Sequence, residues 1–168
     1  AKMKTKAQRL SITMIVLVAM VGMALWFPRE THASAIVVNT NLDELNGTPG
    51  NGNCSLREAI SNANNDNGNQ ADCNAGSVND LIALPGWTYT LTGSSGDDNN
   101  VSGDLDIQGN LTIAGAGSGI TIIQAGTSSP VDGTCLDCVD RVLHIQAGAE
   151  VSINNVMIRY GKGPDGTA

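Results

Sequence analysis

The hydrophobic pattern of the chain changes near Asp80. Beyond this point, large aliphatic or aromatic residues occur in pairs at i and i+2, with mostly polar residues between them and glycines around them. Two side chains at this spacing lie on one face of a short strand. The pattern predicts short strands carrying the pairs Ile82/Leu84, Tyr89/Leu91, Leu105/Ile107, Leu111/Ile113, Ile120/Ile122, Leu143/Ile145, Val151/Ile153 and Val156/Ile158.

In five of the later pairs we name the isoleucine at the second position as a residue that lines the interior of the fold. We expect these side chains to be buried and the residues beside them, such as Asp106 and Ser152, to face outward. The predicted interior set is Ile107, Ile113, Ile122, Ile145 and Ile153.

Two stretches of the chain are versions of one another. L-D-I-Q-G-N-L-T-I at 105–113 matches L-H-I-Q-A-G-A-E-V-S-I at 143–153 if two residues are inserted, and each continues into a third aliphatic pair. Three short strands per turn are the unit of a parallel β-helix, whose coils stack because one coil cannot bury its inner face. Residues 126–140 interrupt the repeat as a loop. The alternative, a β-sandwich, expects longer strands and more aromatic residues than this region has.

A helical period precedes the strands. Four apolar residues lie at i, i+3, i+4 and i+7, on one helical face: Leu56, Ala59, Ile60 and Ala63. Ser55 is a favourable N-cap, and Glu58 three residues later completes a capping box. We predict a helix over about 55–64 that covers the open end of the first coil, where strand edges would otherwise be exposed.

The first 35 residues have the order of a secretory signal peptide. Basic residues at 2–9 precede an apolar run at 12–27, and Ala33-Ser34-Ala35 forms an A-x-A cleavage site. We predict cleavage after Ala35, with Ala33 as the second choice. A single membrane anchor is the alternative, but the apolar run is shorter than the about 20 residues that span a bilayer.

After the signal segment the chain is strongly acidic. Four of its nine Lys and Arg residues lie there, against fifteen of its sixteen Asp and Glu residues. Such a surface repels nucleic acid and anionic lipid, so we expect no nucleic-acid partner. Membrane contact is expected only through the signal segment or an anchor beyond the C-terminus.

All four cysteines follow the signal segment. In an exported chain an even number indicates disulfides, and four cysteines allow three pairings. We favour Cys54–Cys73, which would tie the helix start to the end of the Asn-rich loop after it, together with Cys135–Cys138. The second pair could also be a redox motif or half of a zinc site. A redox motif needs a thioredoxin-like context, which is absent. A zinc site needs two more ligands, and His144 is the only histidine after the signal segment.

The string C-S-L-R-E-A-I at 54–60, followed by Ala63-Asn64, resembles the signature of the CSLREA domain. That domain opens many secreted bacterial proteins whose bodies are similar to right-handed parallel β-helices of the pectin-lyase-like kind. The resemblance implies an all-β solenoid capped at its N-terminal end by a short amphipathic helix. It implies a signal peptide at 1–35, a cap at 36–80, first coils at 81–168 and further coils beyond them.

Parallel β-helices host polysaccharide lyases and glycoside hydrolases, and most glycoside hydrolases act through paired carboxylates. Three pairs of acids are close in sequence: Asp97/Asp98, Asp104/Asp106 and Asp137/Asp140. Asp104 and Asp106 should point outward from one strand, as surface acids commonly do. The resemblance of 62–68 to an EF-hand loop fails, because the first ligand position is Ala63 and no closing Glu follows.

His144 and two arginines complete the search for chemistry. His144 is expected to face outward, with no Ser or Cys partner for nucleophilic catalysis. Arg141 and Arg159 could be neighbours on successive strands, and are more simply solvated or salt-bridged. We therefore expect no catalytic, cofactor-binding or metal-binding residue in this segment.

Two functions remain open from the sequence. The first is a secreted or cell-surface scaffold that is adhesive or binds an extracellular glycan or cell-surface component, without catalysis or cofactor. The second is a carbohydrate-active enzyme whose site lies in later coils.

Overall fold

The computed structural model describes residues 34–47, 49–128 and 137–163. The apolar segment at 12–27 and Cys135, with its predicted bond to Cys138, lie outside them. Within them, no helix is long and apolar enough to cross a membrane. The elements are β1 (Ser34–Val37), α2 (Leu56–Asn64), β2 (Asn79–Leu84), β3 (Thr88–Thr90), β4 (Leu105–Ile107), β5 (Asn110–Gly115), β6 (Ile122–Gln124), β7 (Leu143–Ile145), β8 (Val151–Asn154) and β9 (Met157–Arg159).

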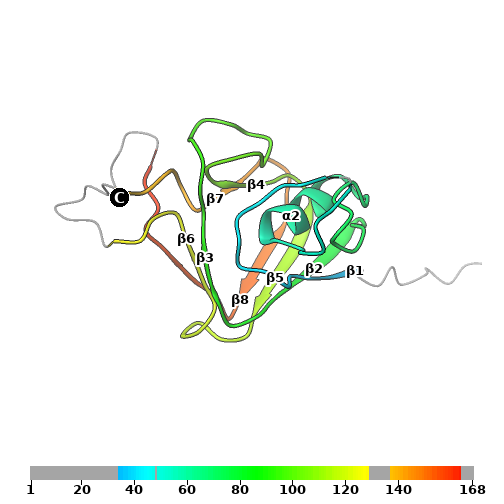
Figure 1. The fold of residues 1–168 in the computed structure, drawn as a ribbon, viewed down its shortest axis with the longest axis horizontal. Coiled ribbons are helices and arrows are strands. Elements are labelled where there is room, and N and C mark those ends of the chain that lie inside the picture. The colour runs from blue at the N-terminus through cyan, green and yellow to red at the C-terminus, as the bar shows by residue number, and fades with distance from the viewer. Residues whose placement is uncertain (1–33, 48, 129–136, 164–168) are drawn as a thin grey trace, which may run out of the picture. The chain divides into compact units, whose positions relative to one another are not determined.

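The strands form three parallel sheets, with the orders β1-β2-β5-β8, β3-β6-β9 and β4-β7. From β2 onward the chain enters the three sheets in a fixed order: β2, β3, β4, then β5, β6, β7, then β8, β9. Figure 1 shows β2, β5 and β8 side by side, with the other two sheets apart from them. The described chain is thus mostly strand with little helix, as the all-β prediction requires. Its parallel pairing is incompatible with the antiparallel sandwich alternative.

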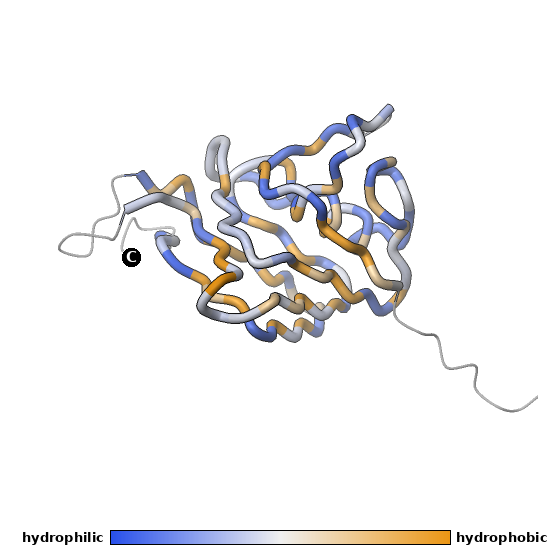
Figure 2. The backbone as a smooth tube through the Cα atoms, turned by 60° about the horizontal axis from the view of Figure 1, so that its bottom comes forward, coloured by the Kyte–Doolittle hydropathy of each residue, from blue (hydrophilic) through white to orange (hydrophobic). Residues whose placement is uncertain are grey.

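The strand register stacks aliphatic side chains into ladders. In the largest sheet Ile36 pairs with Ile82, Ile82 with Ile113, and Ile113 with Ile153. The first three of these side chains are fully buried. Figure 2 shows hydrophobic residues recurring along the strands. Each rung packs its apolar side chain on the rung below, which removes both from water.

The predicted interior set is confirmed for Ile107 and Ile113, which are fully buried. Ile145 and Ile153 align with them in the register but are less covered, and Ile145 is 47% exposed. Their strands, β7 and β8, are the last described strands of their sheets. No described strand therefore packs on their outer side.

The assignment of Ile122 to the interior is wrong. Ile123 is fully buried in its place and pairs with Tyr89 and Ile158, whereas Ile122 is half-buried. A turn before β6, in which Gly117 accepts bonds from the amides of Ile120 and Thr121, shifts the inward positions by one residue. Ile120 consequently lies in the turn and is 57% exposed.

The predicted helix and one disulfide are confirmed. Ser55 caps α2, and Glu58 completes the capping box. The helix packs against β2, β4 and β5 with its predicted apolar face, Leu56, Ala59 and Ile60, buried. The Cys54–Cys73 disulfide joins the helix start to the loop after the helix. A cross-link closing a loop of this size contributes about 3 kcal/mol in the chain-entropy model.

Ile113→Ala should lower the free energy of unfolding by about 2–5 kcal/mol, because it opens a cavity in the middle of the isoleucine ladder. Ile122→Ala, in the neighbouring sheet, is the matched control and should cost clearly less. Urea denaturation of both variants measures the two losses. Equal losses would contradict the register of β6.

Candidate functional site

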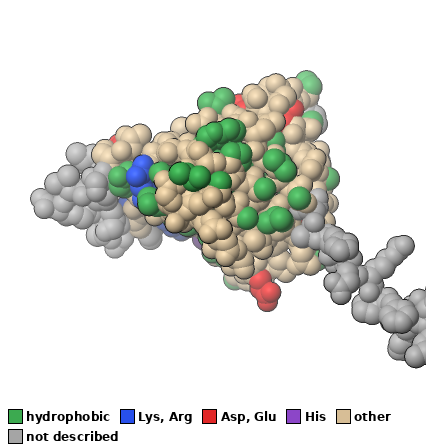
Figure 3. All heavy atoms as spheres, turned by 90° about the horizontal axis from the view of Figure 1, so that it is seen from below, with side chains coloured by type: hydrophobic (Ala, Val, Ile, Leu, Met, Phe, Trp, Pro, Cys, Tyr) green, Lys and Arg blue, Asp and Glu red, His purple; other side chains and the backbone are tan. Residues whose placement is uncertain are grey.

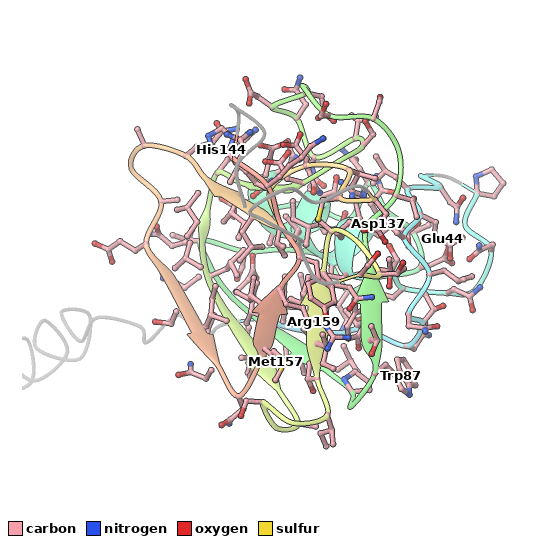
Figure 4. The ribbon with its side chains drawn as sticks, turned by 90° about the vertical axis from the view of Figure 1, so that its left-hand side faces the viewer. Glu44, Trp87, Asp137, His144, Met157 and Arg159 are labelled. Atoms are coloured by element: carbon pink, nitrogen blue, oxygen red, sulfur yellow. A yellow bond between two sulfur atoms is a disulfide. The ribbon has the colours of Figure 1, made fainter. Side chains whose placement is uncertain are left out.

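Ionisable side chains gather on the outer side of β4 and β7. The register of these strands sets Asp106 opposite His144. The N-terminal ends of both strands bring in Asp104 and Arg141, and the 92–103 loop adds Asp98. Figure 4 shows His144 at the opposite end of the molecule from Trp87 and Met157.

His144 stands between two carboxylates. Its Nδ1 lies 2.8 Å from Oδ1 of Asp106 and 3.3 Å from Oδ1 of Asp98. The Asp106 side chain is fully buried, His144 is 29% exposed and Asp98 is 73% exposed. One ligand atom from each residue lies within 4.8 Å of the others, so these three residues could hold a metal ion.

Asp104 forms a second, adjoining charge pair. Its Oδ2 accepts a 2.8 Å hydrogen bond from Nε of Arg141, while its fully buried Oδ1 has no partner among the described residues. Burial raises the pKa of Asp104, and the charge of Asp106 adds to the rise, while Arg141 opposes it. Asp104 and Asp106 thus form a buried pair of acids with one arginine as counter-ion.

A loop held by Asp97 covers these acids. Asp97 accepts hydrogen bonds from the amides of Asn99, Val101 and Ser102 and from the Ser102 hydroxyl. Partial burial works against its ionisation, but these four bonds outweigh it and lower the pKa of Asp97. The amide of Asn100 then donates to Oδ2 of Asp106, at 2.9 Å.

Side chains of helix α2 hold the end of the 92–103 loop and β4 in place. Arg57, which is 2% exposed, pairs with both carboxylate oxygens of Asp43 and donates to the carbonyls of Gly103 and Asp104. Asn64 at the helix end donates to the Asp106 carbonyl. The helix therefore sets the position of the strand that carries Asp104 and Asp106.

Asp106 and His144 lie on the outer side of their strands, as expected, but they are not free surface residues. Asp104 and Asp106 leave the strand on its outer side, but the 92–103 loop buries them completely. His144 is not an isolated surface residue, because it meets two carboxylates. The sequence did carry a signal for this contact, since the repeat aligns Asp106 with His144. No pattern indicated that Asp98 would join them.

Within the described residues, Asp137, Asp140 and Arg159 do not form a site together. Asp140 lies beside Arg141, whereas Asp137 binds Thr127 and Ser128, and the Thr127 hydroxyl is the main cause that lowers the pKa of Asp137 to about 2. Arg159 donates to the side chain of Gln124. Arg141 is salt-bridged, as expected for it.

A groove with polar side chains crosses β2, β5 and β8. Its volume is about 290 Å³, and its lining is Asn79, Asp80, Asn110, Leu111, Thr112, Glu150, Val151 and Ser152. Asp80 is 2% exposed, and its carboxylate accepts bonds from the Ser77 amide and hydroxyl. Burial raises the pKa of Asp80 despite these bonds. Sequence reasoning missed this groove, because its residues meet only through the register.

No family model, curated protein or solved structure matches this chain.

Arg57→Met should lower the free energy of unfolding by about 3–5 kcal/mol, because it leaves the buried Asp43 carboxylate without its counter-charge. Arg159→Met removes a more exposed guanidinium and serves as the control with a smaller loss. Chemical denaturation compares the two. A loss for Arg57→Met no larger than for the control would contradict the buried role of Arg57.

Asp97 and Asp80 should give opposite pH dependences. The lowered pKa of Asp97 stabilises the fold above the unfolded-state pKa, near 3.8, and this stabilisation is lost as pH falls through the folded-state value. The raised pKa of Asp80 favours the folded state below about 3.8, and that contribution is lost as pH rises.

The measurement is urea denaturation of Asp97→Asn and Asp80→Asn between pH 3 and pH 7. As pH rises, the free energy of unfolding of Asp97→Asn should fall relative to that of the unmutated protein. The free energy of unfolding of Asp80→Asn should rise relative to it. Parallel curves for the two variants would refute the two shifts.

Proposed function

We propose that this chain is a scaffold of a secreted or cell-surface protein, built as a right-handed parallel β-helix, and that its groove across β2, β5 and β8 binds an extracellular glycan. The fixed order in which the chain enters three parallel sheets supports the solenoid. So do the ladders of equivalent residues, in which each sheet adds one strand per round.

The CSLREA-like motif fits a structural role. Its side chains form a disulfide, a helix cap, an apolar face and a buried ion pair: Cys54, Ser55, Leu56, Arg57, Glu58, Ala59 and Ile60. Each of these contacts joins the helix to the sheets or loops around it. This accounts for the motif without any catalytic step, and it supports a cap on the end of a β-helix.

The polar lining of the groove is the observation that carries the binding proposal. Amide, hydroxyl and carboxylate groups line it, and such groups hydrogen-bond sugar hydroxyls. Its volume of about 290 Å³ is near the lower end of the range of ligand sites. The net acidic character of the chain favours a neutral glycan over an acidic one.

A carbohydrate-active enzyme remains the second candidate, and one observation favours it. Asp80 and Glu150 both line the groove, and burial raises the pKa of Asp80, as a general acid requires. The pair Asp104 and Asp106 does not favour it, because neither residue lines the groove.

Thr112→Val should weaken binding of a neutral glycan by about 2- to 10-fold, the loss expected for one neutral hydrogen bond. Thr88→Val on β3, outside the groove, is the matched control and should leave affinity unchanged. Titration calorimetry on ligands selected from a panel of neutral and acidic glycans measures both. Absence of binding across the panel, or equal losses, would refute the groove as a glycan site.

The same panel separates scaffold from enzyme. Under the scaffold proposal, no polysaccharide yields new reducing ends or unsaturated products on incubation with the protein. Turnover that disappears in folded Asp80→Asn or Glu150→Gln would establish the enzyme in its place.

A further inference from the structure

Asp98, Asp106 and His144, here called the His144 cluster, bring three electron-rich atoms together. The Nδ1 of His144 faces carboxylate oxygens at 2.8 and 3.3 Å. A neutral imidazole carries at most one proton at Nδ1, which cannot serve both oxygens well. Two anions around one ring nitrogen are best stabilised by a cation among them.

We propose that the His144 cluster binds a first-row transition-metal dication, Zn²⁺ above all, through Nδ1 of His144 and one oxygen each of Asp98 and Asp106. One imidazole nitrogen and two carboxylate oxygens suit Zn²⁺, whereas Ca²⁺ takes six to eight oxygen ligands. The site is distinct from the glycan groove and does not depend on it.

The spacing of the donor atoms fits such an ion. Bonds of about 2.0–2.2 Å in a tetrahedral arrangement set ligand atoms roughly 3.4 Å apart. The distance from His144 to Asp98 is 3.3 Å already, and the 2.8 Å contact to Asp106 has only to lengthen slightly. All three ligand atoms lie within 4.8 Å of one another, and the exposed Asp98 side chain can turn to bring its oxygen to the ion.

Further contacts hold the Asp106 carboxylate and the backbone of Asp98, as is usual around metal ligands. Oδ2 of Asp106 accepts the amide of Asn100, which leaves Oδ1 for the ion. The carbonyl of Asp98 accepts the side-chain amides of Gln108 at 3.1 Å and Gln146 at 2.8 Å. These glutamines follow β4 and β7 at equivalent positions and fix the loop above His144.

A buried acceptor in the same layer is also unsatisfied. Asn100 is 1% exposed, and its Oδ1 has no hydrogen-bond partner within the part of the chain that the structure describes. Its backbone amide donates to Asp106, and its side-chain nitrogen donates to the carbonyl of Arg57. Buried oxygens without partners are uncommon in folded proteins, and a water bound to an ion is one means of satisfying them.

The local charge also favours a dication. Asp98, Asp104, Asp106 and Asp140 surround the site, with Arg141 as the cation paired to two of them. Since the ligands come from the 92–103 loop, β4 and β7, a bound ion would hold the loop to the sheet. The exposure of Asp98, at 73%, leaves one side of the ion open to water.

The test is calorimetric titration of the chelator-treated full chain with Zn²⁺, and separately with Mn²⁺ and Ca²⁺. We expect saturable 1:1 binding of Zn²⁺ that is at least tenfold tighter than that of Ca²⁺, together with a rise in melting temperature. Asp98→Asn and His144→Asn should each weaken Zn²⁺ binding at least tenfold. Glu150→Gln, an exposed acid outside the cluster, should leave it unchanged.

Asp98 is exposed, so its variant keeps the fold even if His144→Asn does not. For the unmutated protein, Zn²⁺ should also shift the imidazole nitrogen resonances of His144. Absence of saturable Zn²⁺ binding, tighter binding of Ca²⁺, or undiminished affinity in folded Asp98→Asn would each overturn the proposal.

Discussion

The buried ion pair between Arg57 and Asp43 is the interaction on which the arrangement of helix, loops and sheets depends. A guanidinium that is 2% exposed has lost its water and needs protein acceptors at its nitrogens. Nε and both terminal nitrogens of Arg57 have them: both oxygens of Asp43 and the carbonyls of Gly103 and Asp104. Asp43 also accepts the amide and hydroxyl of Thr92. The Arg57–Asp43 pair thereby joins α2 and the segment before it to both ends of the 92–103 loop.

The polar contacts of Arg57 and Asp43, here called the polar junction, and the apolar interior stabilise different parts of the fold. The interior is a set of ladders that a one-residue shift would disrupt, so it fixes the register of the sheets. The junction lies outside the ladders and fixes the loop over the acids of β4. On the face in Figure 3, hydrophobic side chains occur in separate small groups rather than one continuous patch.

Local patterns predicted the local structure well. Apolar spacing and the Ser55/Glu58 pair gave the helix and its start, and the repeat gave the pairing of β4 with β7 and of β5 with β8. What failed depends on contacts distant in sequence. Ile123 replaces Ile122 because a turn shifts the phase of the strand, and Asp106 is buried by a loop whose course no periodicity encodes. The helical pattern gave no role to Arg57, whose burial depends on its contact with Asp43, fourteen residues earlier.

In stacked parallel strands, residues at equivalent positions of the repeat lie next to each other. Neighbouring strands lie about 4.8 Å apart, so residues at one repeat position always reach each other with their side chains. Where the repeat keeps the same residue, as with Gln108 and Gln146, the two amides converge on a single carbonyl. Where it changes the residue, as with Asp106 and His144, a carboxylate meets an imidazole. A change at one repeat position, with its neighbours kept, therefore supplies two of the three ligands of the proposed metal site, and Asp98 of the 92–103 loop supplies the third. Such differences between equivalent positions are the part of the sequence in which the chemistry of this fold is encoded.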